Sequence, residues 1–304
     1  MHTVSEALPR GEPLVTIDIT ELETHRRHAM TESGAVSYLD VGRGHPAVFI
    51  HGLVTNSLLW RHVISEVACE QRRCIAVDLP GHGHTPAAPA DADVSLTGLA
   101  RRVIELCDHL GLDRFDLVAN NTGGAVGQIV AAHLSERLST LTLTNCDTEG
   151  NTPPILFKPF AIAARLGLLA KFGPRIAASR GLMLRGLTAG YRHPGRLPAE
   201  VVDAYIRPVF GTPESSRAVA RISAAISNAD VAAVRPQLAQ LKVPTLIVWG
   251  TGDVFFPLKW AQRLSDLIPG TTKVATVDDA RMHFPDERAA EFLPLLREHW
   301  AAHQ

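Results

Sequence analysis

The segment LVANNTGGAVGQ, residues 117–128, has the form of a turn that presents one side chain for chemistry. The pattern small, any, apex, any, small is met by residues 119–123, with Asn121 at the apex. Small residues are needed there because the apex backbone is strained and a helix packs closely behind it. This geometry exposes the side chain of Asn121 and puts the backbone N–H of Thr122 at a helix N-terminus, where it can stabilise an oxyanion.

A second N–H donor of this kind is predicted directly after the apolar run AVFIH. Gly52 lets the chain turn so that the backbone N–H of Leu53 can point into a site, as an oxyanion-binding loop requires. His51 is expected to shape this turn. Trp60, in the same loop, is expected either to pack the helix that follows or to contact a substrate.

Candidate acids and a base follow later apolar runs. Asp253 comes after TLIVWG and His283 comes after KVATV, so a carboxylate is available to orient a histidine that acts as a general base. Asp147, after LTLTN, is an alternative acid, and an Asx turn is its structural explanation. Phe255 is a candidate wall of an apolar substrate pocket.

The elements that must position these turns alternate between strands and helices. Short apolar runs predict buried parallel strands at residues 47–51, 74–78, 115–119, 141–145, 245–250 and 273–277, and alternating patterns predict edge strands at 14–19 and 35–42. Helical patterns lie between most of them, including one from the N-cap Ser95 to Gly111. The predicted fold class is α/β, with a mostly parallel sheet flanked by helices and ligands at the carboxyl ends of its strands.

The alternation stops for about ninety residues. From residue 153 to 241 there are helical patterns separated by Pro and Gly and no strand-like runs. We therefore predict a core domain formed by residues 1–152 and 242–304, with residues 153–241 inserted as a helical cap.

Composition excludes several classes of partner. The chain has 30 Lys and Arg against 31 Asp and Glu, without a basic stripe, so nucleic acid is not expected as a partner. No window approaches the roughly 20 apolar residues of a membrane span, and the first residues lack the apolar run of a signal peptide. Four cysteines in apolar segments predict reduced thiols. We expect a cytoplasmic monomer or homodimer with no membrane partner and neither metal nor organic cofactor.

From about residue 30 to 300 the chain resembles the α/β-hydrolase superfamily. The segments HGLVTNSLLWRHV and DLPGHGHT are similar to the branch of haloalkane dehalogenases and epoxide hydrolases, and the order apex, acid, histidine is the order of that fold's catalytic residues. The resemblance implies that Asn121 stands at the nucleophile position, Asp253 at the acid and His283 at the base. It also implies an oxyanion hole at Leu53 and Thr122.

Three departures limit what the resemblance implies. This branch uses Asp at the apex, commonly in GND(S/T)GGA, and a neutral amide such as that of Asn121 is a far poorer nucleophile, which closes the covalent route. Dehalogenases usually have Trp after the apex and often Asn after His-Gly, where this chain has Thr122 and Leu53, so halide binding is disfavoured. Epoxide hydrolases typically use cap tyrosines to protonate the epoxide oxygen, and Tyr191 and Tyr205 are the candidates here.

Three explanations of Asn121 are open. It is a deliberate replacement of Asp that traps substrate, or the native residue of an enzyme with noncovalent chemistry such as elimination, cyclisation or rearrangement, or part of a catalytically silent small-molecule-binding protein. The template chemistry is hydrolysis of an epoxide, an ester or a carbon–halogen bond. The apolar, weakly charged character of the candidate pocket residues predicts a small hydrophobic organic substrate.

Overall fold

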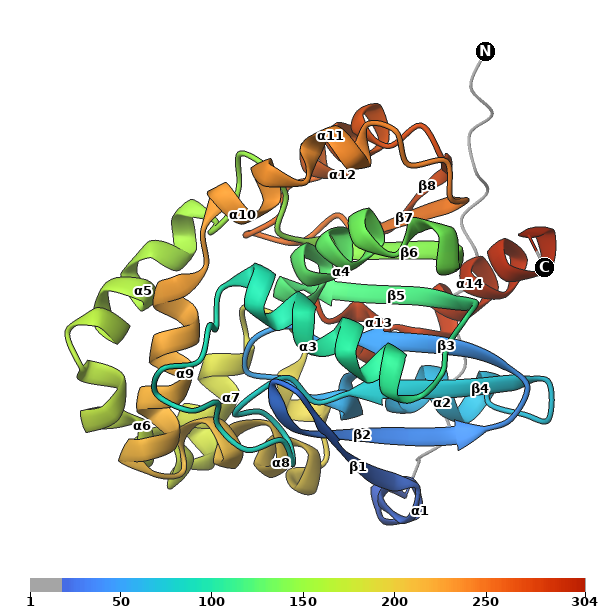
Figure 1. Ribbon diagram of the computed structural model, residues 1–304. Coiled ribbons are helices and arrows are strands. Elements are labelled where there is room, and N and C mark those ends of the chain that lie inside the picture. The colour runs from blue at the N-terminus through green and yellow to red at the C-terminus, as the bar shows by residue number, and fades with distance from the viewer. Residues whose placement is uncertain (1–17, 304) are drawn as a thin grey trace.

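The computed structural model describes residues 18–303 and has a mixed sheet at its centre (Figure 1). Within those residues the sheet has eight strands in the order β1-β2-β4-β3-β5-β6-β7-β8. β1 and β4 pair antiparallel with β2, and all other neighbours are parallel. The strands are β1 (Arg26–Thr31), β2 (Gly34–Gly42), β3 (His45–Ile50), β4 (Arg72–Val77), β5 (Phe115–Asn121), β6 (Leu138–Cys146), β7 (Thr245–Gly250) and β8 (Thr271–Val277).

The apolar runs of the sequence form the middle of this sheet. β5, β6 and β7 are buried along almost their whole length, as expected for parallel strands covered on both faces. The predicted fold class is thereby confirmed. β8 is different: residues 271–277 are largely exposed because the strand is the edge of the sheet, so the prediction of a buried strand there was wrong.

The N-terminal part of the sheet also differs from the sequence prediction. Residues 14–17 of the predicted strand 14–19, like the segment examined for a signal peptide, lie outside the described residues. Asp18 instead caps the helix α1 (Ile19–Thr24), since its side chain accepts a hydrogen bond from the N–H of Thr20. β1 was not predicted, because only Ala29 of its polar sequence RRHAMT is buried and an edge strand needs little apolar alternation.

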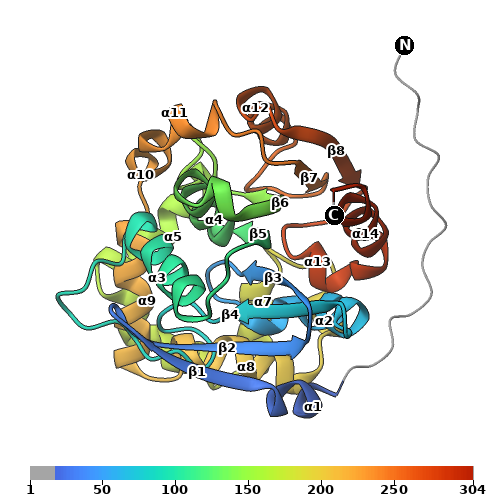
Figure 2. The ribbon, with the colours of Figure 1, turned by 45° about the vertical axis from the view of Figure 1, so that its right-hand side comes forward.

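Helices cover both faces of the sheet. α3 (Leu96–His109) and α4 (Thr122–His133) lie on one face, with α2 (Arg61–Val67) and α14 (Ala289–His303) on the other (Figure 2). α3 begins as predicted, with Ser95 Oγ accepting from the N–H of Gly98 at 3.1 Å. Shorter elements connect these layers: η1 (Ser57–Trp60), η2 (Ser135–Arg137), α12 (Lys259–Leu267) and α13 (Phe284–Glu287).

A group of helices stands beyond the carboxyl ends of the parallel strands (Figure 1). It lies between β6 and β7 in the chain and comprises η3 (Ile155–Phe157), α5 (Lys158–Arg165), α6 (Leu168–Ala177), α7 (Arg180–Leu187), η4 (Pro194–Arg196), α8 (Ala199–Phe210) and α9 (Pro213–Ala225). The helices α10 (Asn228–Ala233) and α11 (Arg235–Leu238) follow and pack on α4, so they lead the chain back to the sheet. None of the helices within residues 18–303 is long and apolar enough to cross a membrane.

A buried polar cluster ties these helices to the sheet. Arg61 Nη1 on α2 lies 2.6 Å from the carboxylate of Asp286 on α13. The hydroxyl groups of Tyr191 and Tyr205 donate to Asp286 Oδ2 at 2.7 Å and 3.3 Å. All four side chains are buried, so the charge of each ionised partner depends on the others for compensation. The cluster therefore connects α8 and the segment that follows α7 to the helices α2 and α13 of the core.

Loss of Asp286 is expected to be costly for the whole domain. Asp286→Ala leaves the guanidinium of Arg61 buried without its counter-charge, which predicts a loss of about 3–5 kcal/mol in the free energy of unfolding, measured in urea. Asp203→Ala is the matched control, because Asp203 forms an exposed ion pair with Arg207 at 3.2 Å. It should cost no more than about 1 kcal/mol. Equal losses in the two variants would contradict the role of the buried cluster.

Candidate active site

A cavity of about 180 Å³ lies at the carboxyl ends of the parallel strands, where residues of η3, α5 and α7 and the side chain of Ile226 complete its wall. Six residues singled out from the sequence line it: Leu53, Asn121, Thr122, Asp147, Phe255 and His283. Apolar side chains complete much of the wall, among them Leu156, Phe157, Phe160, Leu187, Ile226 and Met282. Its chemistry is that of a small apolar pocket with a few polar groups at one end.

Asn121 sits at a strained backbone position where β5 ends and α4 begins. Its φ of 56° and ψ of −131° are unusual for a residue with a side chain. Asn121 Oδ1 accepts hydrogen bonds from the backbone N–H of Thr122 at 2.5 Å and from Thr122 Oγ1 at 3.0 Å. Nδ2 donates to Met282 Sδ at 2.6 Å. The amide oxygen thus occupies the N–H donor that the sequence predicted for an oxyanion.

The loop opposite Asn121 approaches it closely. A side chain at Gly52 would collide with the side chain of Asn121, so only glycine fits there. Val54, two residues on, has a φ of 69°, which is strained for a β-branched residue. His51 fixes the turn: its Nε2 accepts from the N–H of Leu79 at 2.9 Å, and Nδ1 then donates to the carbonyl of Gly52 at 2.6 Å.

Asp147 is a buried carboxyl group in the wall of the cavity. Burial raises its pKa to about 7, with a smaller contribution from the nearby charge of Asp253. Thr122 Oγ1 lies 3.3 Å from Asp147 Oδ2 and 3.0 Å from Asn121 Oδ1, and its single hydrogen cannot serve both acceptors at once. A protonated Asp147 resolves this conflict, because it can itself donate to the threonine hydroxyl.

Asp253 is not among the residues that line the cavity, although it was the preferred acid. Its Oδ1 accepts from the N–H groups of Phe255 at 2.8 Å and Phe256 at 3.2 Å, and its Oδ2 accepts from Asn145 Nδ2 at 2.8 Å. Burial raises the pKa of Asp253 to about 6, while these hydrogen bonds favour the ionised form. The structure therefore shows Asp253 holding its own turn and not the imidazole of His283.

His283 is buried, and neither ring nitrogen has a hydrogen-bond partner among residues 18–303. Burial lowers its pKa to about 3, with a smaller contribution from His51, so the ring is neutral at physiological pH. The backbone N–H of His283 donates to the carbonyl of Gly190 at 2.9 Å. The ring of Tyr191 packs edge-on against the imidazole of His283, with the two ring centroids 4.9 Å apart. A side chain at Gly190 would collide with His283 Nδ1, so this glycine, which the sequence did not single out, permits the contact.

Three residues with a predicted substrate contact lie elsewhere. Trp60 is fully buried and packs on Phe49 with ring centroids 5.3 Å apart, which is the helix-packing alternative. Tyr191 and Tyr205 direct their hydroxyl groups to Asp286, and neither lines the cavity. This is a correction to the expectation that they protonate a substrate oxygen. Burial raises the pKa of both, so both hydroxyl groups keep their protons.

Two further features bear on ligands. In the described part of the chain no three His, Cys, Asp or Glu side chains are grouped so that they could hold a metal ion. The unpartnered nitrogens of His283 and the unpartnered Oδ1 of Asp147 are costly when buried. A ligand with one polar group among apolar atoms would satisfy them and would suit the remaining wall.

Comparisons with known proteins agree with this arrangement. The family described as the alpha/beta hydrolase fold matches residues 46–287. The chain is 31% identical over 260 residues to haloalkane dehalogenase 2 of Mycobacterium bovis, covering 78% of this chain and 81% of that protein. Among solved structures, the epoxide hydrolase CorEH matches 92% of this chain and 99% of its own, with a TM-score of 0.73 and 22% identity. Cfl2 from Burkholderia cenocepacia matches 90% and 94%, with a TM-score of 0.75 and 22% identity.

The close approach of Gly52 to Asn121 yields a test of the strained turn. Gly52→Ala should lower the free energy of unfolding by about 1–3 kcal/mol through overpacking. In an Asn121→Gly background the same substitution should cost much less, because the side chain with which it collides is gone. A double-mutant cycle in urea measures this coupling. Gly195→Ala is the control, since a side chain there meets nothing within 4 Å; additive effects of Gly52→Ala and Asn121→Gly would contradict the contact.

Proposed function

This chain belongs to the α/β-hydrolase fold family and is a hydrolase of that family, and we propose that it adds water directly to a carbon–oxygen bond of a small, largely apolar epoxide or ester. One observation carries the proposal. A carboxyl group with a pKa raised to about 7 and a histidine with a pKa lowered to about 3 face the same apolar cavity beside Asn121. Pairs of titratable groups whose pKa values are pushed apart are the pattern of an acid and a base.

His283 is the proposed base. It is neutral above a pH of about 3, and its buried nitrogens have no protein partner in the described chain that would compete for a water molecule. A histidine with a pKa this low is a weak base in the resting state. Imidazolium formation becomes easier when a polar ligand or water enters and when Asp147 loses its proton, because both reduce the penalty for a charge at His283.

Asp147 is the proposed acid. Below a pH of about 7 its carboxyl group holds a proton, and that proton can pass to the oxygen that leaves carbon. In one step, the oxygen of water bonds to carbon, the carbon–oxygen bond breaks, His283 accepts a proton from the water and Asp147 gives its proton to the leaving oxygen. The sum is addition of water, and solvent later returns the proton from His283 to Asp147.

Asn121 takes no covalent part in this reaction. Its amide oxygen is bound by the N–H and hydroxyl of Thr122, as a carboxylate oxygen would be, while its NH₂ group faces Met282. The position is therefore suited to a carboxylate nucleophile, but the residue present is neutral. We propose that the second N–H of the Asn121 amide and the backbone N–H of Leu53 polarise and orient the substrate, since the N–H of Thr122 already donates to Asn121 Oδ1.

An oxygen leaving group is favoured over a halide. A protonated carboxyl group such as that of Asp147 helps an oxygen to leave, whereas a halide ion is a weak base and needs N–H donors instead. The similar proteins include one named haloalkane dehalogenase and one named epoxide hydrolase, so their names alone do not choose between a carbon–halogen and a carbon–oxygen bond. We further propose that residues 153–241 act as a cap whose Phe157 and Phe160 select apolar substrates.

A catalytically silent binding protein is the second candidate. The observation in its favour is that both carboxylate oxygens of Asp253 accept hydrogen bonds from Asn145 and from backbone N–H groups, so Asp253 does not orient His283. The two candidates differ in turnover. A panel of aryl epoxides and aryl esters that bind but are never consumed would favour the binder.

The pH dependence of kcat/KM should follow the protonation of Asp147. If this group is the acid, kcat/KM falls by about tenfold per pH unit above its pKa of about 7, because the proton-bearing form is lost. Asp147→Asn should lower the plateau below pH 7 by roughly 10²–10⁴-fold and remove that alkaline limb. Asp253→Asn should keep the limb. A limb that persists unchanged in Asp147→Asn would contradict the assignment.

Asn121→Asp should open the covalent route. Its carboxylate would attack carbon, so we expect a burst of product and a protein adduct with the mass of the epoxide, detected on the peptide that contains residue 121. Combining it with His283→Ala should make the adduct accumulate, since water is then not activated. Peptide mass analysis of the unaltered protein is the control, because it shows whether residue 121 remains an amide. Absence of an adduct in both variants would exclude this geometry.

A further inference from the structure

The outer helices of the cap carry an unusual distribution of charge. Residues 151–199 contain eight Lys and Arg and no Asp or Glu, although the whole chain is balanced. Lys158, Arg165, Lys171 and Arg175, on α5 and α6, are all exposed. None of these four forms an ion pair within residues 18–303. This surface is therefore strongly cationic at neutral pH.

Large apolar side chains are exposed on the same helices. Leu166 is 68% exposed, Ile162 56% and Phe172 40%. Lys171 and Arg175 flank the ring of Phe172, with their charged groups 5.4 Å and 5.6 Å from its centroid. Exposed Leu, Ile and Phe among Lys and Arg are typical of helices that lie in a membrane interface. We call the surface formed by Leu156, Arg165, Leu166, Lys171, Phe172 and Arg175 the cap face.

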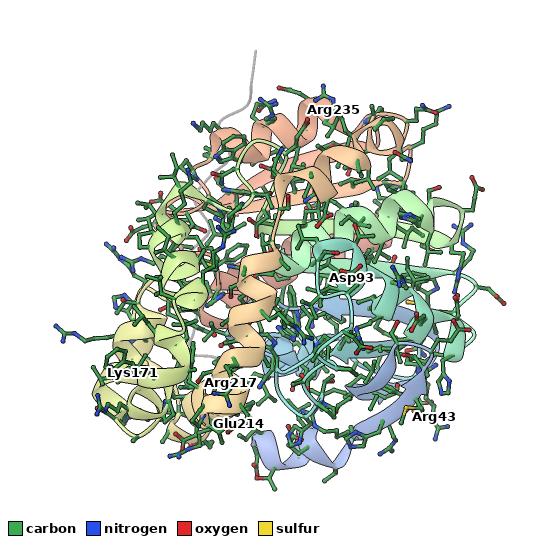
Figure 3. All side chains as sticks on the ribbon, turned by 60° about the vertical axis from the view of Figure 1, so that its left-hand side comes forward. Arg43, Asp93, Lys171, Glu214, Arg217 and Arg235 are labelled. Atoms are coloured by element: carbon green, nitrogen blue, oxygen red, sulfur yellow. The ribbon has the colours of Figure 1, made fainter. Side chains whose placement is uncertain are left out.

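Acidic groups from the neighbouring helices do not neutralise the cap face. α6 packs on α8 and α9, and two of the three acidic residues on those helices, Asp203 and Glu214, are engaged with their own arginines, while the third, Glu200, lies in the first turn of α8 without an ion pair to the described residues. Asp203 pairs with Arg207 at 3.2 Å, and Glu214 pairs with Arg217 at 2.5 Å. In Figure 3, Lys171 extends outward from α6, whereas Glu214 and Arg217 lie together on α9.

The cap face is continuous with the wall of the cavity. Leu156 is 56% exposed and also lines the cavity. Behind it, Phe157 and Phe160 line the cavity with ring centroids 5.1 Å apart. Leu156 therefore joins the exposed apolar side chains of η3 to the apolar wall of the cavity.

We propose that the cap face docks on an anionic lipid bilayer and that the lipophilic substrate passes from the bilayer into the cavity past Leu156. Phe172 and Leu166 insert among the acyl chains near the headgroups, and the flanking Arg and Lys contact lipid phosphates. A second copy of the chain is a poorer occupant, because two cap faces would bring like charges together. The proposal departs from the expectation of no membrane partner, which rested on the absence of a spanning segment.

Only the substrate route depends on the proposed function. Docking is measured without turnover, so its failure leaves the hydration chemistry untouched, and a lack of turnover leaves docking untouched.

Cosedimentation with vesicles tests the docking. At about 0.05 M salt the protein should bind vesicles of phosphatidylglycerol and phosphatidylcholine in equal parts, bind phosphatidylcholine vesicles much less, and be released at about 0.5 M salt. The triple variant Arg165→Glu, Lys171→Glu, Arg175→Glu should bind the anionic vesicles at least about 100-fold more weakly. Arg43→Glu, Lys242→Glu, Arg263→Glu is the control with the same change in charge, and it should retain most of the binding. Figure 3 shows Arg43 on the side of the molecule opposite Lys171.

A second variant tests the apolar contribution. Leu166→Ser with Phe172→Ser keeps every charge and should still lose at least about tenfold in vesicle binding, since two inserted side chains are removed. No binding by the unaltered protein, or equal losses in the cap-face and control triple variants, would overturn the proposal. So would a dimer that forms without vesicles and is lost in the Leu166, Phe172 variant, because the face would then be an interface between copies.

Discussion

The site depends on a strained turn at Asn121 that close packing maintains. An asparagine with a φ of 56° and a ψ of −131° is unfavourable in itself, and the N–H of Thr122 together with the bare backbone of Gly52 allows the chain to adopt it. The turn directs the amide into the cavity at the start of α4. Through Thr122, whose hydroxyl lies between Asn121 and Asp147, it also links the apex to the buried carboxyl group.

Burial beneath the helices α5–α9 sets the protonation of the groups around this turn. The same removal from water raises the pKa of Asp147 to about 7 and lowers that of His283 to about 3, so both groups are mainly neutral between these two pH values. Neutral groups suit an apolar cavity that takes up an uncharged molecule. The cluster around Asp286 attaches α8 and the segment after α7 to the core, so the burial that shifts the two pKa values depends on these contacts.

The sequence located the groups that follow directly from strand ends. Asn121, Leu53, Thr122, Asp147 and His283 line one cavity because parallel strands end at the same edge of a sheet, while their catalytic roles stay predictions. It could not decide which carboxyl group faces the cavity, because that choice depends on the donors of Asn145 and the turn at residues 255–256. Nor could it orient Tyr191 and Tyr205, whose partner Asp286 is distant in the chain. The edge strand β1 escaped detection because its residues are mostly exposed.

In the proposed reaction water attacks the substrate directly, without an intermediate on residue 121. The decisive measurement is a single turnover of an aryl epoxide in water enriched with ¹⁸O, followed by mass analysis of the diol and of the peptide that contains Asn121. Direct attack by water predicts that the diol formed in the first turnover carries ¹⁸O and that the peptide carries none. A first-turnover diol whose new oxygen is ¹⁶O, derived from the protein, would exclude direct attack.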